Sequence, residues 1–399
     1  MTTAAIPIGD ARRDAKVMGL VSVAHFASHY YQLVLPPLFP ILKEEWGVSY
    51  TALGLAVTVF YLASGLGQFI AGFVVDRIGA RPVLLAGVVL IAGASGAIGL
   101  TGSYEALLPL AALAGLGNAV FHPADYSILS ASVQERRLGR AYGFHTLGGT
   151  LGYAAAPATI LPLALAIGWR GALMVAALIG LAIAVLLVVN GDLLRDGRTP
   201  AATERRPSAA AAILQAPVVL CFVYFVFFAA GLTVVQAFFP TAVGSLFGTP
   251  PAVAAAALTG YFLGNACGIL AGGVIADRWP RPDAIVVAGL IGSGIFLAIA
   301  GLFPLAAVAL TAAVAGAGAC SGATSASRDM LVRSTAPAGA RGRVFGFVYS
   351  ALDVGGAIAP VAAGFLLDRG RADFVFALMA GCYLAAAVTV PFVRRLSRI

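Results

Sequence analysis

The stretch GNAVFHPADYS carries polar side chains in an otherwise apolar part of the sequence. Asn118, His122 and Asp125 recur at intervals of four and three residues, which places them on one face of a helix. Histidine titrates near neutral pH, so His122 and Asp125 are predicted to exchange a proton, with a purely structural hydrogen bond as the alternative. Pro123 removes one backbone hydrogen bond and predicts a kink in this helix.

A second helix face, nearer the N-terminus, has the same spacing of polar groups. His25, His29 and Gln32 again stand four and three residues apart. For the two histidines, proton binding and structural packing are equally good interpretations. The remaining histidine, His145, falls near the end of a different apolar segment, where we expect a packing role. The two polar faces together predict a site for protons and a small solute.

The second half of the sequence supplies further charged groups inside apolar segments. Arg328 and Asp329 lie toward one end of the tenth such segment. Arg328 would suit a bidentate contact with a phosphonate or carboxylate, or it lies at the membrane surface. Asp353 could carry a proton, but bracing a cluster of arginines is the favoured interpretation. Gln236 and Asn265 are weaker polar candidates.

The composition indicates that these polar groups lie inside a membrane. Hydrophobic residues make up 60% of the chain, charged residues only 11%, and the mean hydropathy is +0.94. Soluble domains carry about 25% charged residues, so a soluble protein is excluded. Segments long enough to cross a bilayer occur near 17–42, 51–75, 82–101, 105–132, 139–167, 170–190, 215–243, 251–275, 283–303, 305–327, 343–367 and 372–393. An all-helical membrane protein with twelve spans is therefore predicted, and its ionisable groups should face the interior.

The distribution of lysine and arginine predicts how the spans are oriented. All but four of the 25 basic residues fall in loops on one side. The exceptions are Lys43, Arg170, Arg369 and Arg371. Because cytoplasmic loops are enriched in positive charge, both termini are predicted to lie in the cytoplasm of a bacterial inner membrane. The net charge of +8 is thus a topology signal and not a nucleic-acid surface.

Two pairs of motifs repeat at an offset of about 200 residues. GFVVDRIGARP at 72–82 matches GGVIADRWPRP at 272–282, and GRAYGFHTLGGTLGYAAAP at 139–157 matches GRVFGFVYSALDVGGAIAP at 342–360. Two six-helix bundles of similar build are predicted, at 1–190 and 215–399, joined by a polar cytoplasmic linker at 191–214. Pro157 and Pro360 end the second pair of motifs and are predicted to kink their spans.

The first pair of motifs resembles the signature of the major facilitator superfamily, and the resemblance extends over essentially the whole chain. It implies a twelve-helix fold in two pseudo-symmetric six-helix bundles. It also implies that the signature loops latch the two bundles together on the cytoplasmic side. The residues of this expected gate are Gly72, Asp76, Arg77, Gly79 and Arg81, with Asp277, Arg278 and Arg281 in the second, degenerate copy.

Three further stretches resemble the bacterial fosmidomycin-resistance group of this superfamily. They are HFASHYYQLVLPPLFPIL, GLGNAVFHPADYS and GFHTLGGTLGYAAAP. This resemblance implies export of a small anionic or amphiphilic compound, similar to a phosphonate antibiotic, in exchange for protons.

Two other functions are weighed against proton-coupled export. One is import of a small organic anion by proton symport on the same fold. The other is a membrane enzyme or sensor, which is disfavoured because no metal-site spacing and no soluble catalytic domain is evident. We expect no metal, no cofactor and no nucleotide, since the proton gradient would supply the energy. The expected partners are protons, lipid and a small-molecule substrate, and the expected oligomeric state is a monomer.

Overall fold

The computed structural model describes residues 8–195, 214–279, 281–336 and 341–397, and every regular element in these ranges is a helix. Most of the expected linker at 191–214 thus lies outside the described residues. The first half contains α1 (Ile8–Gln32), α2 (Phe39–Trp46), α3 (Tyr50–Ile78), α4 (Ala80–Leu100), α5 (Tyr104–Asn118), α6 (Phe121–Ser132) and α7 (Leu138–Val189). Three short 3₁₀ turns accompany them: η1 (Pro36–Leu38), η2 (Glu135–Arg137) and η3 (Gly191–Leu193). The second half contains α9 (Ala216–Phe247), α10 (Pro251–Arg278), α11 (Pro282–Leu302), α12 (Ala307–Ala323), α13 (Ser325–Thr335), α14 (Arg341–Asp368) and α15 (Ala372–Ser397).

These helices form the twelve predicted membrane spans. Ten helical segments of the described chain are long and apolar enough to cross a bilayer. One of them, α7, contains two spans, because Gly168 adopts φ 79° and ψ 156° and reverses the chain there. The first span is α1, whose start is charged and whose later part carries the histidines. The twelve-span prediction is confirmed.

Spans 4 and 10 are each built from two shorter helices. In span 4, α5 ends at Asn118 and α6 begins at Phe121, so the break falls just before Pro123. Pro123 stands in the first turn of α6, where a missing N–H costs least. Pro157 and Pro360 behave differently, since α7 and α14 continue past them. Pro360 instead lies where α14 approaches α3 closely, with its carbonyl against Gly54.

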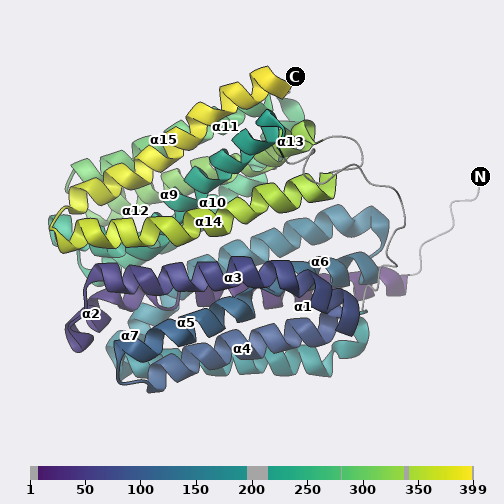
Figure 1. Ribbon diagram of the computed structural model, residues 1–399, viewed down its shortest axis with the longest axis horizontal. Coiled ribbons are helices and arrows are strands. Elements are labelled where there is room, and N and C mark those ends of the chain that lie inside the picture. The colour runs from purple at the N-terminus through teal and green to yellow at the C-terminus, as the bar shows by residue number, and fades with distance from the viewer. Residues whose placement is uncertain (1–7, 196–213, 280, 337–340, 398–399) are drawn as a thin grey trace, which may run out of the picture.

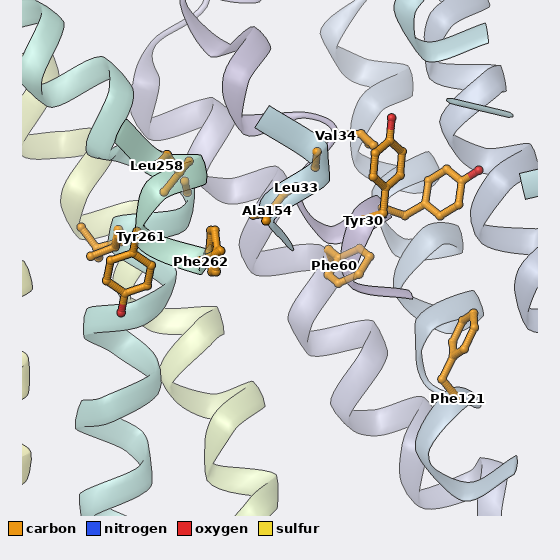
Figure 2. Packing of buried hydrophobic residues seen from close by; sticks show 14 of the residues in the cluster. Tyr30, Leu33, Val34, Phe60, Phe121, Ala154, Leu258, Tyr261 and Phe262 are labelled. Atoms are coloured by element: carbon orange, nitrogen blue, oxygen red, sulfur yellow. The ribbon is translucent and has the colours of Figure 1, made fainter. Parts of the chain in front are cut away.

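The two halves lie side by side as two groups of helices (Figure 1). Contacts between them are made mainly by α3 with α14 and by α7 with α10. Figure 2 shows Phe262 of α10 beside Ala154 of α7, and the ring of Tyr153 stacks on Phe262 at a centroid distance of 5.0 Å. The start of α1 and the end of α15 lie at one end of the bundle, called here the terminal end, and α2 lies at the opposite, far end (Figure 1).

Candidate proton and substrate site

A buried carboxylate in the first half is surrounded by histidines from three helices. Asp125 of α6 is completely buried. Its Oδ2 atom lies 3.0 Å from His145 Nε2 of α7 and 3.3 Å from Nδ1 of His25, on α1. The expected exchange between His122 and Asp125 is therefore replaced by contacts of Asp125 with His145 and His25. His145, for which we expect a packing role, has the shorter of these two contacts with the carboxylate.

The cluster continues from Asp125 toward the middle of the protein. The ring of His25 stacks on His145 at 3.6 Å between centroids, and lies 4.5 Å from His29 and 5.0 Å from His122. His25 is buried, His29 is half-buried and His122 is exposed. The histidines thus connect the buried Asp125 to the surface of a cavity, as a chain of protonatable rings.

Close contact between α1 and α7 leaves room for these rings only because residue 149 has no side chain. A Cβ atom on Gly149 would lie 2.8 Å from His25 Cδ2 and 2.9 Å from His29 Cε1. Neighbouring glycines 148 and 152 lie against backbone carbonyls of α1, which fixes the separation of the two helices.

Alanine at position 149 should therefore displace the histidines and impair transport. Overpacking of this size costs about 1–3 kcal/mol, so the melting temperature should fall by a few degrees. The matched control is Gly143→Ala on the same helix, where an added Cβ would meet open space. The melting temperature and the transport rate should both fall in Gly149→Ala, and both should stay at the wild-type values in Gly143→Ala. Equal behaviour of the two variants would contradict this account of the packing.

A cavity of about 140 Å³ lies between the two halves, beside His29 and His122. This volume would hold about five water molecules at about 30 Å³ each, so the site fits a small solute. Both halves contribute polar side chains to its wall. Its lining residues are His29, Gln32, Tyr61, Ser64, Gln68, Asn118, His122, Tyr153, Ala229, Leu232, Thr233, Gln236, Tyr349, Leu352 and Asp353.

Hydrogen bonds order the polar side chains of the first half along this cavity. Gln32 Nε2 donates to Asn118 Oδ1 at 3.2 Å, and Asn118 Nδ2 donates to Ser64 Oγ at 2.9 Å. Tyr153 donates to Gln32 Oε1 at 2.7 Å. Gln32 and Asn118, expected on two helix faces, are thus joined directly and share the cavity with His29 and His122.

Tyr61 makes a hydrogen-bond contact that crosses the cavity from the first half to the second. The Tyr61 hydroxyl of α3 lies 3.3 Å from Oε1 of Gln236 on α9, and at the same distance from Gln32 Oε1. It can donate one proton to only one of them at a time. Tyr61 therefore links the halves through a weak, exchangeable contact.

Asp353 is the carboxylate that the second half presents to the cavity. Asp353 is half-buried on α14 and faces Gly65 of α3. A Cβ atom added to Gly65 would lie 2.8 Å from the Cβ atom of Asp353. Among the residues that the structure describes, no ion pair involves Asp353. The favoured interpretation, in which Asp353 braces arginines, is therefore wrong for this structure.

Arg328 and Asp329 of α13 do not line the central cavity; the Arg328 side chain is mostly buried, whereas that of Asp329 is 44% exposed. The Arg328 Nε atom lies 3.1 Å from Asp329 Oδ1, and Tyr349 donates to the same oxygen at 2.7 Å. The Arg328 guanidinium also packs over the rings of Phe225 and Phe228 at 5.0 and 5.3 Å. Neither expectation, an anion clamp or a surface arginine, describes this position.

Among the described residues, no ion pair joins the signature loops of the two halves at the terminal end. Asp76, Arg77, Asp277 and Arg278 are exposed, and no ion pair involves them in the described part of the chain. The remaining charged members contact their own half. Arg81 lies against Gly191, and Arg281 Nη2 lies 3.5 Å from Asp283 Oδ2. Gly72 lies in the last turns of α3, and Gly79 follows directly after this helix.

A connection between the halves is found at the far end instead. Asp368, at the end of α14, accepts hydrogen bonds from the backbone N–H groups of Tyr50 and Thr51 at 2.8 and 2.9 Å. It also accepts one from the Thr51 hydroxyl at 2.6 Å, and Lys43 lies 3.7 Å away. A carboxylate at a helix N-terminus is favourable, so Asp368 caps α3 from the opposite half. We call these contacts the far-end latch.

Two groups in the histidine cluster have the residue types of a transition-metal site. They are His25, His29 and His122, and His25, Asp125 and His145, with candidate atoms within 4.8 Å of one another. Ligand atoms around a tetrahedral zinc ion lie about 3.3 Å apart, given bond lengths of about 2.0 Å. The His25, His29 and His122 rings would have to close around an ion, whereas Asp125 already lies at hydrogen-bond distance from His145.

Twelve spans in two halves around a polar central cavity are the architecture of a membrane transporter. The model of the Major Facilitator Superfamily matches residues 21–250 and 220–398. The chain therefore belongs to this superfamily of membrane transporters, and is not an enzyme. Solved structures share the fold at low sequence identity. A bacterial homologue of the human lysosomal transporter Spinster, inward-facing and occupied, is 15% identical, with TM-score 0.76 over 96% of this chain and 97% of that one.

Curated relatives differ in what they transport. The fosmidomycin resistance protein of Escherichia coli is 30% identical over 154 residues, 37% of this chain and 36% of that protein. The probable nitrate/nitrite transporter NarK2 of Mycobacterium tuberculosis is 26% identical over 359 residues, 87% of each chain. The 4-hydroxybenzoate transporter PcaK of Pseudomonas putida is 28% identical over 38% of this chain and 34% of its own. The chain thus matches only about a third of the first of these relatives.

Proposed function

We propose that this transporter couples the movement of protons to export of a small anionic or amphiphilic compound. The observation that carries the proposal is the continuity between the buried Asp125, its histidine neighbours and the cavity between the halves. Ionisable groups are costly inside a membrane and typically serve transport pathways and proton relays. The two halves would rock about this cavity and expose it to each side in turn.

The walls of the cavity support a small, partly anionic solute. Its lining contains no lysine or arginine among the described residues, so positive charge would come from His29 and His122 when they are protonated. Amide and phenol groups from Gln32, Gln236 and Tyr61 would donate further hydrogen bonds. Export is preferred because the fosmidomycin resistance protein is a relative.

Proton symport of a small organic anion, in the importing direction, is the second candidate. The observation that favours it is the presence of His29 and His122 in the cavity wall. An anion held by these rings in their protonated form would travel together with the bound protons, not against them. The similarity to a probable nitrate/nitrite transporter over 87% of the chain adds to this candidate.

Proteoliposomes with imposed pH gradients distinguish the two candidates. Radiolabelled fosmidomycin, nitrate and 4-hydroxybenzoate would each be tested with acid-inside and alkaline-inside vesicles. Exchange for protons accumulates the solute in acid-inside vesicles, whereas symport accumulates it in alkaline-inside vesicles. We expect fosmidomycin to accumulate in the acid-inside vesicles. Accumulation of a solute that is independent of either gradient would contradict proton coupling.

A further inference from the structure

A second pocket, of about 550 Å³, lies at the terminal end of the second half, between the start of α11 and the end of α15. It shares no lining residue with the central cavity, and the proposed transport cycle does not use it. Its lining residues are Arg281, Asp283, Ala284, Val287, Val390, Pro391, Arg394 and Arg395.

The pocket has an excess of positive charge that the protein itself holds in place. Asp283 Oδ2 lies 2.6 Å from Arg394 Nη1 and 3.5 Å from Arg281 Nη2, so one carboxylate orients two guanidinium groups. Arg395 is exposed and has no ion-pair partner in the described part of the chain. Three arginines against one aspartate leave the pocket cationic.

The equivalent position in the first half is filled by the chain. The repeat aligns Arg81, in the first turn of α4, with Arg281, directly before α11, and each arginine is followed by proline. In the first half η3 continues from α7, and its Gly191 packs directly against the Arg81 guanidinium, while Leu194 is buried. In the second half, the described residues leave the corresponding space open as the pocket. Arg81 thus packs against the chain that follows α7, whereas Arg281 lines a cavity.

We propose that this pocket binds the phosphate group of an anionic phospholipid, with an acyl chain lying along its apolar wall. Guanidinium groups match phosphate oxygens in bidentate geometry, and Arg281, Arg394 and Arg395 surround the space. Val287 and Val390 supply an apolar wall that a free anion would not need. The pocket lies at the ends of two membrane spans, where a phospholipid headgroup lies, and basic pockets between spans are suited to anionic headgroups.

Native mass spectrometry of the full, delipidated chain tests this proposal directly. Equal amounts of phosphatidylglycerol and phosphatidylcholine would be offered in detergent. We expect one phosphatidylglycerol to be retained in preference, and the preference to fall about tenfold in the Arg281→Gln, Arg394→Gln, Arg395→Gln triple variant. The matched control replaces three exposed arginines at the same end, Arg136, Arg140 and Arg333, by glutamine. This control should bind lipid as the wild type does.

Two further measurements separate lipid binding from misfolding and from binding of a free anion. Arg395→Gln alone removes a side chain without an ion-pair partner and should not disturb folding, yet we expect about a threefold loss of preference. Inorganic phosphate, offered without lipid, separates a headgroup from a free anion. Equal retention of the two lipids, or phosphate binding with the same arginine dependence and no lipid preference, would overturn the proposal. These measurements need no transport activity, so they stand apart from the proposed function.

Discussion

Asparagine in place of Asp125 is expected to abolish gradient-driven transport while the protein stays folded. The amide has nearly the same shape as the carboxyl group and can keep the 3.0 Å contact with His145, but it cannot bind and release a proton. Accumulation of the transported solute in proteoliposomes under a pH gradient should fall at least about tenfold, the size expected for loss of a proton-transfer group. Exchange of labelled for unlabelled solute without a gradient should continue, because the cavity is untouched.

The control for this experiment is Asp373→Asn at the far end, where the carboxylate is exposed and pairs with Arg371 at 3.0 Å. It should accumulate solute at the wild-type rate. An Asp125→Asn variant that still drives accumulation would assign Asp125 a structural hydrogen bond only. The proton-carrying role would then pass to Asp353, the carboxylate in the cavity wall, and Asp353→Asn would become the decisive variant.

The histidine cluster illustrates how much of such a site a sequence can predict. Spacing of four and three residues identified the polar faces that carry His25 and Asp125, because helical periodicity is a local property. His145 is predicted to have only a packing role, since α7 contains no other histidine and no carboxylate that could partner it at helical spacing. Its position beside Asp125 depends on how α1, α6 and α7 pack, which no single helix determines.

The second half shows a different limit. The repeat offset locates Arg328 and Asp353 along their spans, but it does not determine which face of each helix meets the cavity. Arg328 turns toward aromatic rings within its own half, while Asp353 faces the cavity from α14. Tyr61 and Tyr153 were missed for a similar reason. Tyrosines in membrane spans usually pack, and only the hydrogen bonds to Gln32 and Gln236 distinguish these two.

The far-end latch provides the second large expected effect, on the conformation of the protein. In this structure Asp368 joins the halves at the far end, while no ion pair between described residues joins the signature loops at the terminal end. Alanine in place of Asp368 removes three hydrogen bonds to a charged acceptor, two of them from backbone N–H groups at the start of α3. These hydrogen bonds are exposed, so together they contribute less than the roughly 1.5–3 kcal/mol each that is typical of hydrogen bonds to charged groups. A net loss of about 1.4 kcal/mol raises the population with an open far end about tenfold, which is the effect that we expect.

Spin labels on both sides of the latch would measure this shift. Glu44→Cys in the first half and Asp373→Cys in the second are both exposed, and Cys267 and Cys320 would be replaced by serine to leave only the buried cysteines. Asp368→Ala should enlarge the long-distance fraction between the labels.

Lys43→Gln is the matched test of what holds the latch closed. The Lys43 ammonium lies 3.7 Å from Asp368 and is partly exposed, so its loss should cost less than about 1 kcal/mol and change the populations only severalfold. A larger effect from Lys43 than from Asp368 would mean that charge attraction, and not capping of α3, closes the far end. Unchanged distances in both variants would instead assign closure to apolar packing between the halves, such as Phe39 against Phe238.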